Sequence, residues 1–386
     1  MKISTLDLRT GIYALNISTC ATWDQQGITV AGNHNGSPGN GLGELNAPVG
    51  IFVNNNDTLV ITDRDNHRIM KYYPNAISGE IVAGDGTPGN SAYQLNQPKG
   101  VVMDQSGDII VADSSNYRIQ KFVNGSLMGI TLFANSTSNL LGQMRDLHID
   151  VNNNIYVTDS DFDKIVKYSP YVSNRVILAG GGASGSANNQ LLIPFGCYID
   201  AYDTLYIADS GNNRVMKYVS GATTGILVAG NNIAGGTAQD ELQNPIAVIA
   251  DNNGYVDSSS KRNRQKNVFF YVRNIYVADS GNNRIMKWTT NFALGGECVV
   301  GCTGASGSAV DKLDAPRDLK FDQYGNLYVS DQNNNRVQKF LIQRPASCRA
   351  CKSLFFSEFL QLILSKFILL FFSRSMTNQS QRKTTD

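Results

Sequence analysis

The residues of this sequence that are best suited to chemistry are three histidines and a set of regularly spaced aspartates. The histidines are His34, His67 and His148. His34 and His67 could reach one face of a domain near Asp63 and Asp65, and such a group could bind zinc or calcium. The sequence contains no HExxH, no GxxxxGK[ST] phosphate loop and no GxSxG nucleophile turn. We therefore predict no catalytic residue, no metal site and no cofactor.

The aspartates belong to a unit that occurs six times and is clearest in residues 205–218, LYIADSGNNRVMKY. Alternating apolar residues, a polar turn and a second run of β-formers predict a β-hairpin. The aspartate and the basic residue five positions later are Asp63 and Arg68, Asp113 and Arg118, Asp159 and Lys164, Asp209 and Arg214, Asp279 and Arg284, and Asp331 and Arg336. We interpret these pairs as structural, because the two side chains can meet across the turn and the aspartate can accept turn hydrogen bonds.

The spacing of the hairpins predicts the fold. Each hairpin is preceded by one strand, as at residues 98–104, and followed by another, as at 79–84. Four strands in every repeat of 46 to 70 residues indicate a β-propeller. One fourth strand, near residues 27–32, precedes the first hairpin, and none follows the last. We therefore predict an all-β, six-bladed propeller of four-stranded antiparallel blades that is closed by the N-terminal strand.

The repeat resembles the NHL repeat over roughly residues 19–341. The resemblance rests on the recurring pattern of Pro-x-Gly, Gly-Asn-Leu-Tyr-Val and Asp-x-x-Asn-x-Arg. Blade three departs most, since Arg145 and Asp146 stand where blade two has Lys99 and Gly100. The resemblance implies a non-catalytic scaffold that binds a protein or peptide. NHL domains also form the C-terminal part of tripartite-motif ubiquitin ligases, but this sequence has no RING domain, so any link to ubiquitination is analogy.

Two other functions remain open as alternatives. Some NHL domains bind RNA, and some similar propellers are metal-dependent lyases or hydrolases. The chain has a net charge of +1, whereas residues 255–273 contribute +4 and residues 341–386 contribute +5. The remaining repeat body is therefore about −8, which repels phosphate and disfavours RNA. The few histidines disfavour a zinc enzyme.

We expect ligand contacts where the repeats differ from one another. The turns after each aspartate share a face with the glycine-rich loops that lead into the blades. The variable turn residues of blades one to three, which we align at one equivalent position, are His67, Tyr117 and Phe162. The full set of candidate residues on this face is His34, His67, Tyr117, Asp161, Phe162 and Asp163. Aromatic anchors beside carboxylates favour a protein or peptide partner with a basic surface, bound by a monomer. The alternative is that all six are ordinary exposed turn residues.

Three segments do not fit the repeat. Residues 1–18 precede it and contain no apolar core of a signal peptide, so we expect a soluble propeller in an undefined compartment. Residues 255–273 interrupt a tight turn of blade five. The tail at 342–386 contains an apolar stretch, 354–372, that could lie on a membrane as an interfacial helix or span it. The insertion and the tail could also be translated non-coding sequence.

Cysteines and glycosylation sequons leave the compartment open. Cys298 and Cys302 flank the fourth strand of blade five, where they could form a disulfide or stay reduced. Sequons of the Asn-x-Ser/Thr type, which would matter only in a secreted protein, begin at Asn16, Asn35, Asn56, Asn124, Asn135 and Asn378.

Overall fold

The computed structural model describes residues 4–6, 13–15, 17, 20–137, 140–170, 172–231, 235–251, 274–289 and 295–344. The chain divides into two compact units, residues 1–17 with 23–342 and residues 18–22 with 343–386. The insertion at 255–273 and the apolar stretch at 354–372 lie outside the described residues, as do the predictions that concern them. No helix in the described part of the chain is long and apolar enough to cross a membrane.

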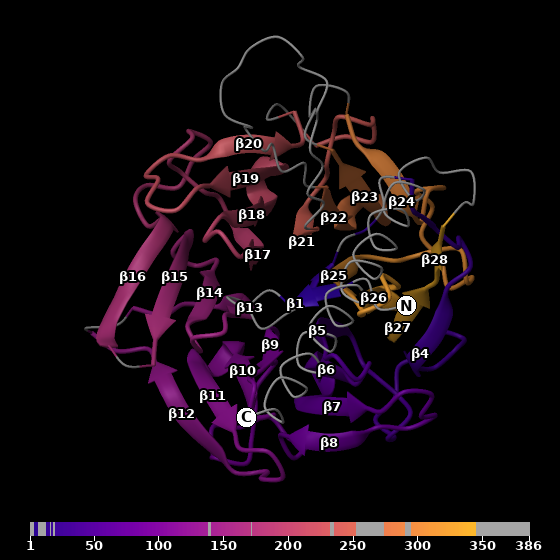
Figure 1. The fold of residues 1–386 in the computed structure, drawn as a ribbon. Helices are drawn as coiled ribbons and strands as arrows, with labels where there is room; N and C mark the ends of the chain where they lie inside the picture. The colour runs from indigo at the N-terminus through magenta and orange to yellow at the C-terminus, as the bar shows by residue number, and fades with distance from the viewer. Residues whose placement is uncertain are drawn as a thin grey trace, which may run out of the picture. The chain divides into compact units, whose positions relative to one another are not determined.

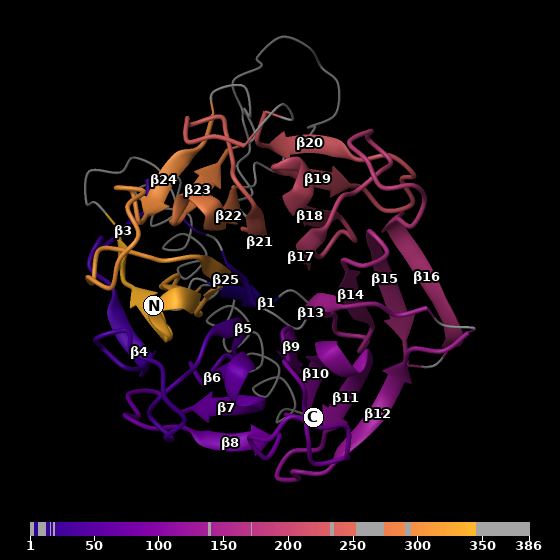
Figure 2. The same cartoon turned by 180° about the vertical axis from the view of Figure 1, so that it is seen from behind.

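Residues of the first unit form six four-stranded antiparallel sheets arranged around a central axis (Figure 1). Blades one to three consist of β5 (Pro48–Val53), β6 (Leu59–Asp63), β7 (Arg68–Tyr72) and β8 (Glu80–Ala83); β9 (Val101–Met103), β10 (Ile109–Asp113), β11 (Arg118–Phe122) and β12 (Gly129–Ala134); and β13 (Met144–Ile149), β14 (Ile155–Asp159), β15 (Lys164–Ser169) and β16 (Val172–Gly180). The first strand of each blade lies nearest the axis (Figure 2).

The other three blades repeat this arrangement. They consist of β17 (Pro194–Ile199), β18 (Leu205–Asp209), β19 (Arg214–Tyr218) and β20 (Ile226–Ala229); β21 (Pro245–Ala250), β22 (Ile275–Asp279), β23 (Arg284–Trp288) and β24 (Glu297–Val300); and β25 (Pro316–Phe321), β26 (Leu327–Asp331), β27 (Arg336–Phe340) and β4 (Ile28–Gly32). The short strands β1 (Ser4–Leu6) and β2 (Tyr13–Leu15) pair with each other, and β3 (Thr22–Trp23) and β28 (Ile342–Gln343) are two residues each.

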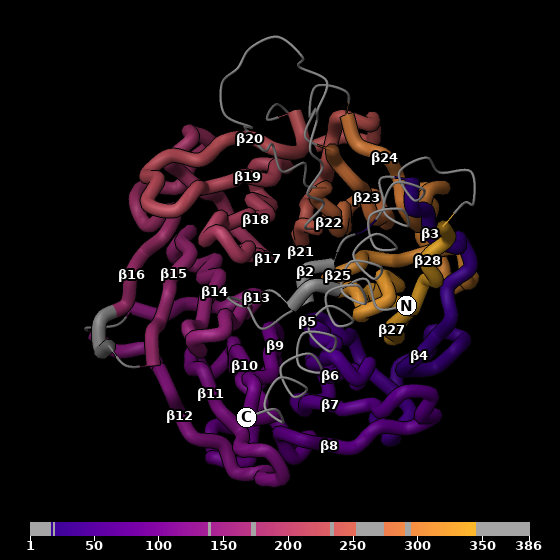
Figure 3. Tube along the Cα trace, viewed as in Figure 1, coloured from indigo at the N-terminus to yellow at the C-terminus, as the bar shows by residue number. Residues whose placement is uncertain are grey.

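The ring is closed by strand exchange. β4, from the start of the chain, is the outer strand of the last blade and pairs antiparallel with β27, with Gly32 opposite Arg336 and Ala31 opposite Val337. Figure 3 shows indigo β4 beside yellow β27. The predicted six-bladed propeller and its N-terminal closure are both confirmed.

The second strand of every blade is buried along its whole length because neighbouring blades cover both of its faces. In β18, Tyr206 and Ala208 pack with Val248 of the next blade, whereas Leu205 and Ile207 join the core shared with the preceding one. Burial on both faces explains why the sequences of these strands consist mainly of apolar residues.

The turn after each second strand holds the repeated aspartate and arginine together. In blade four, Arg214 Nε donates to Asp209 Oδ2 at 2.7 Å, and both side chains are fully buried. Asp209 Oδ1 accepts from the backbone N–H of Leu192, while the arginine also donates to carbonyls of the loop that leads into the blade. Burial raises the pKa of Asp209, and these hydrogen bonds act in the opposite direction.

Candidate ligand-binding site

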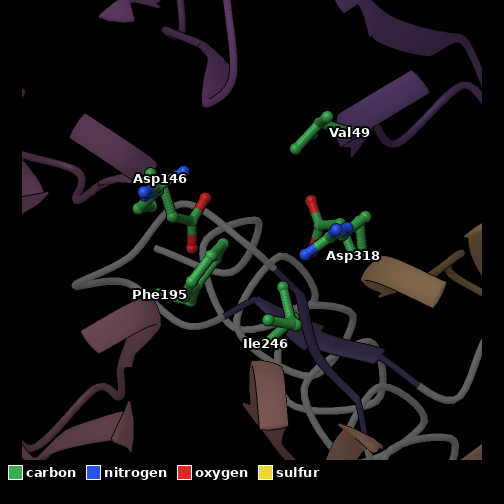
Figure 4. Close-up of a pocket in the computed structure, with 9 residues that line it drawn as sticks. Val49, Asp146, Phe195, Ile246 and Asp318 are labelled. Carbon is green, nitrogen blue, oxygen red and sulfur yellow. The ribbon is translucent and has the colours of Figure 1, made fainter. Parts of the chain in front are cut away.

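A recess lies at one end of the central axis, on the same face as the aspartate turns. This face is fixed by register, since Pro194 at the start of β17 pairs with Asp209 at the end of β18. With the open solvent at its entrance included, the recess measures about 250 Å3, and it is lined by Val49, Gly50, Arg145, Asp146, Phe195, Ile246, Ala247, Arg317 and Asp318. Figure 4 shows the labelled lining residues converging from different blades. We call this end of the axis the channel mouth.

Five of the lining residues occupy one repeated position, directly after the proline that opens the first strand or after its equivalent, and Lys99 occupies the same position in blade two without lining the recess. The six residues there are Val49, Lys99, Arg145, Phe195, Ile246 and Arg317. Three of the six residues are cationic and three are apolar, so a positive charge is not a repeated feature of this position. Since the fold needs no charge at this position, the cations are candidates for function.

Neutral side chains hold these three cations in place. Lys99 Nζ donates to Gln143 Oε1 at 3.1 Å, and Arg145 Nε donates to Ser160 Oγ at 3.3 Å. Arg317 Nε donates in the same way to Gln332 Oε1, in the turn of its own blade. Among the ion pairs of the described residues, none includes Lys99, Arg145 or Arg317. The three cations are therefore held by neutral groups and form no ion pair among the described residues, although the nearby charge of Asp161 acts to raise the pKa of Lys99 and of Arg145.

Burial and mutual repulsion disfavour the charged forms of these side chains. Burial lowers the pKa of Lys99 to about 8, and the nearby charges of Arg145 and Arg64 act in the same direction. Burial, with repulsion from Arg64 and Arg145, lowers the pKa of Arg317 to about 10. An anion bound among these groups would relieve the repulsion, so the site is electrostatically suited to one.

Phe195 supplies an aromatic surface between the two arginines. The Arg145 guanidinium carbon lies 4.6 Å from the centre of the Phe195 ring, and that of Arg317 lies 5.8 Å away. Both distances are within the range of cation–π attraction. Val49 and Ile246 add further apolar surface to the mouth.

Two carboxylates lie one position deeper, and both link neighbouring blades. Asp146 Oδ2 accepts from the backbone N–H of Cys197 at 3.3 Å, and Asp318 Oδ2 accepts from that of Ile51 at 2.9 Å. Asp318 Oδ1 also lies 2.6 Å from Lys320 Nζ. Burial and the charge of Asp318 raise the pKa of Asp146 to about 7. We interpret this pair as structural, because each carboxylate fixes the first strand of the next blade.

The structure gives several of the sequence-predicted site residues a role between blades. His67, in the left-handed conformation (φ 52°), accepts at Nδ1 from the backbone N–H of Gln97 in the next blade. Asp163 does the same for Ile193, as do Asn213 for Asn244, Asn283 for Ala315 and Asn335 for Ala47. We call these contacts the inter-blade latch. His67 and Asp163 thus have a structural role that the sequence did not reveal.

Tyr117 is the exception at this position. It has the same left-handed backbone (φ 51°), but among the described residues its side chain accepts no hydrogen bond from the next blade, and it is 38% exposed. The backbone N–H at the corresponding position of blade three, that of Gln143, instead donates to Asp161 Oδ2 within the same blade. Tyr117 therefore remains available for contact with a ligand.

The equivalence of Phe162 with His67 and Tyr117 is wrong by one residue. The left-handed residue of blade three is Asp163 (φ 46°), so Phe162 stands where the other turns have Asn66, Asn116 or Asn212. Those asparagines donate to the aspartate of the pair, whereas Phe162 lies 4.5 Å from Lys164 Nζ, measured to the ring centre. The error arose because the turn of blade three lacks the repeated asparagine that sets the alignment.

The histidines do not assemble with carboxylates. His34 is exposed in its loop, and within the described ranges no three His, Cys, Asp or Glu side chains are grouped closely enough to hold a metal ion. The residues of the mouth itself were missed as a site. Part of the signal was present, since Arg145 departs from the repeat pattern at the position that Lys99 holds in blade two.

Comparison with known proteins agrees with the architecture. Fold and site define the chain as a six-bladed β-propeller with a recess at one end of its axis. It contains NHL repeats, since residues 45–72 and 95–122 match the family model for that repeat. A search of curated protein sequences finds no match.

Solved structures with this fold are distant in sequence. An auxiliary nutrient binding protein from Bacteroides thetaiotaomicron is 14% identical over 83% of this chain and 73% of its own, with a TM-score of 0.59. A gluconolactonase from Xanthomonas campestris is 12% identical over 85% and 99%, with a TM-score of 0.55. Virginiamycin B lyase from Staphylococcus aureus is 13% identical over 83% and 99%, with a TM-score of 0.50. At such identities the likeness concerns the fold alone.

Proposed function

We propose that the protein is a non-catalytic binding module whose channel mouth receives an acidic group of a peptide or protein partner. The observation that carries the proposal is the convergence of Lys99, Arg145 and Arg317 without a carboxylate partner among the described residues. Guanidinium groups bind carboxylates through paired, charge-assisted hydrogen bonds. Because Nε of each arginine is already bonded, the terminal nitrogens are oriented before any ligand arrives.

The dimensions of the mouth favour one side chain or chain end over a large molecule. The enclosed space is far smaller than the roughly 300–1,000 Å3 typical of small-molecule sites. A single aspartate or glutamate could place its carboxylate among the cations and its methylene groups against Phe195 and Ile246. The rest of a peptide would then cross the turn face, where Tyr117 is exposed.

This proposal reverses the charge of the partner expected from sequence. Asp161 and Asp163 suggested a basic partner, but both use a carboxylate oxygen to accept a backbone N–H. The cations of the mouth have no such partner, so an acidic group fits the face better. RNA would also offer anions, yet the acidic repeat body disfavours a long phosphate chain.

Binding of short peptides measured by calorimetry tests the proposal. One peptide carries a central glutamate, a second glutamine in its place and a third phosphoserine. We expect only acidic peptides to bind, and the Arg145→Gln, Arg317→Gln double variant to weaken binding at least tenfold, since each hydrogen bond to a charged group contributes about 1.5–3 kcal/mol.

Lys217→Gln is the matched control, because it removes a positive charge in the middle of β19, away from the mouth. Unchanged affinity in the double variant would place the site elsewhere. Equal binding of the glutamate and glutamine peptides would show that charge is not recognised.

A further inference from the structure

The cysteines of the described part of the chain are mostly oxidised. Cys298 and Cys302 form a disulfide, and Cys20 is disulfide-bonded as well. The free cysteine in this part is Cys197, which is buried. Disulfides persist in oxidising compartments and are rare in the cytosol. A chain with this pattern is suited to the secretory route, where asparagine glycosylation also takes place.

Four glycosylation sequons fall within the described residues, and all four asparagines lie on the surface outside the blades' strands. They are Asn35-Gly-Ser37, Asn56-Asp-Thr58, Asn124-Gly-Ser126 and Asn135-Ser-Thr137, and each asparagine is exposed. None contains the proline that would block the motif. A bulky glycan could extend into solvent from each of these positions.

The side-chain nitrogens of these asparagines are not used by the fold. Asn35 and Asn135 take part through Oδ1, which accepts from Ser37 and from Leu141. No Nδ2 of the four sequon asparagines donates a hydrogen bond within the described residues. Repeat asparagines behave differently, since Nδ2 of Asn66 donates to Asp63 and to Gly39 O. The atom that would carry a sugar is thus available in every described sequon.

We propose that Asn35, Asn56, Asn124 and Asn135 are sites of N-linked glycosylation and that the protein matures in an oxidising secretory compartment. The donor is a lipid-linked oligosaccharide diphosphate. Nδ2 loses a proton and forms a bond to the anomeric carbon of the sugar, while the bond from that carbon to the phosphate oxygen breaks and the lipid diphosphate leaves. The Oδ1 contacts of Asn35 and Asn135 are unaffected, because the sugar is added at nitrogen.

Mass spectrometry of the full chain captured from cells that make it tests the proposal. Treatment with peptide N-glycosidase in 18O-labelled water converts each glycan-bearing asparagine to labelled aspartate. We expect labelled aspartate in peptides that contain these four positions. Peptides that cover all four sites and contain only unlabelled asparagine would overturn the proposal, and label at any of them supports it.

A pair of serine variants re-expressed in the same cells links each glycan to its sequon. Ser126→Ala destroys the motif but leaves Asn124 in place, so one step of the electrophoretic shift caused by the enzyme should be lost. Ser106→Ala, in an exposed turn outside any sequon, is the matched control and should keep the full shift. Loss of the same step in both variants would contradict the assignment.

Discussion

At the scale of single residues, the clearest contrast is between the arginine of the regular blades and the lysine of blade three. Arg214 binds Asp209 and the loop carbonyls together, because a guanidinium presents five donors in a fixed plane. Lys164 has one nitrogen, which lies 3.4 Å from Asp159 Oδ2 and donates to Leu140 O. In addition, the backbone N–H of Gly142 donates to Asp159 Oδ2, so Asp159 Oδ1 has no hydrogen-bond partner among the described residues. Blade three is therefore the least regular part of the ring.

The titration of Lys99 predicts how peptide binding depends on pH. Its pKa is lowered from 10.5 to about 8, so the mouth loses a positive charge as pH rises through 8. We expect the affinity for a glutamate peptide to fall above about pH 8. Asp146, with a pKa raised to about 7, becomes charged over a lower range and acts in the same direction. Calorimetry from pH 6 to pH 10 measures the effect.

The lowered pKa of Lys99 also predicts that the free energy of unfolding of the ligand-free protein rises with pH, whereas peptide affinity falls. Between about pH 8 and 10.5 the unfolded chain holds a proton on Lys99 that the folded chain has released, so stability should rise with pH in this window. Lys99→Met should remove the part of both trends that is centred at about pH 8, whereas the contributions of Asp146, with a pKa of about 7, and of Arg317, with a pKa of about 10, should remain. Affinity that stays constant from pH 8 to pH 10 would show that Lys99 does not contact the ligand.

At the scale of elements, the short turns do more than reverse the chain. Each described turn ends in a residue of left-handed conformation, which asparagine and aspartate tolerate better than most other residues. Five of these residues also accept the inter-blade latch bond, so local backbone preference and contact between blades depend on the same side chain. The turns thereby set the position of the next blade's first strand, and with it the residues of the mouth.

Substitution of His67 tests the latch. Asparagine occupies this position in blades four to six, so His67→Asn should keep the bond to Gln97 N–H and leave stability unchanged or slightly higher. His67→Ala should cost about 1 kcal/mol through the lost hydrogen bond. Urea unfolding of both variants provides the measurement. Equal stability of the alanine and asparagine variants would show that the latch does not stabilise the ring.

At the scale of the whole molecule, the ring depends on contacts between distant parts of the sequence. β4 supplies the outer strand of the blade that also contains β25, β26 and β27, and Trp23 Nε1 donates to Gly325 O in that blade. Because β4 pairs with β27, the last blade has its fourth strand and β27 is not left as an unpaired edge. The mouth depends on the same closure, because its cations come from blades two, three and six.

Removal of residues 1–32 should therefore destabilise the propeller severely. The last blade would lose its outer strand, and we expect the loss of a large share of the roughly 5–15 kcal/mol that is typical of folded domains. Thermal unfolding followed by circular dichroism detects it. A peptide of residues 21–34 added in trans should restore part of the stability by strand addition. An unchanged melting temperature in the truncated chain would show that β4 is dispensable.

The sequence by itself determined the repeat, the number of blades and the way the ring closes. These features follow from local patterns, namely two-residue alternation in strands, polar turns and the position of the one fourth strand that precedes the first hairpin. Only the tertiary structure decided which residues share the mouth. Lys99, Arg145 and Arg317 lie far apart in the chain, and their charges repel one another because a closed ring directs equivalent positions toward one axis. The alignment of Phe162 failed for a related reason. In blade three the left-handed residue is defined by backbone conformation and by its bond to Ile193, neither of which the residue types of that turn disclose.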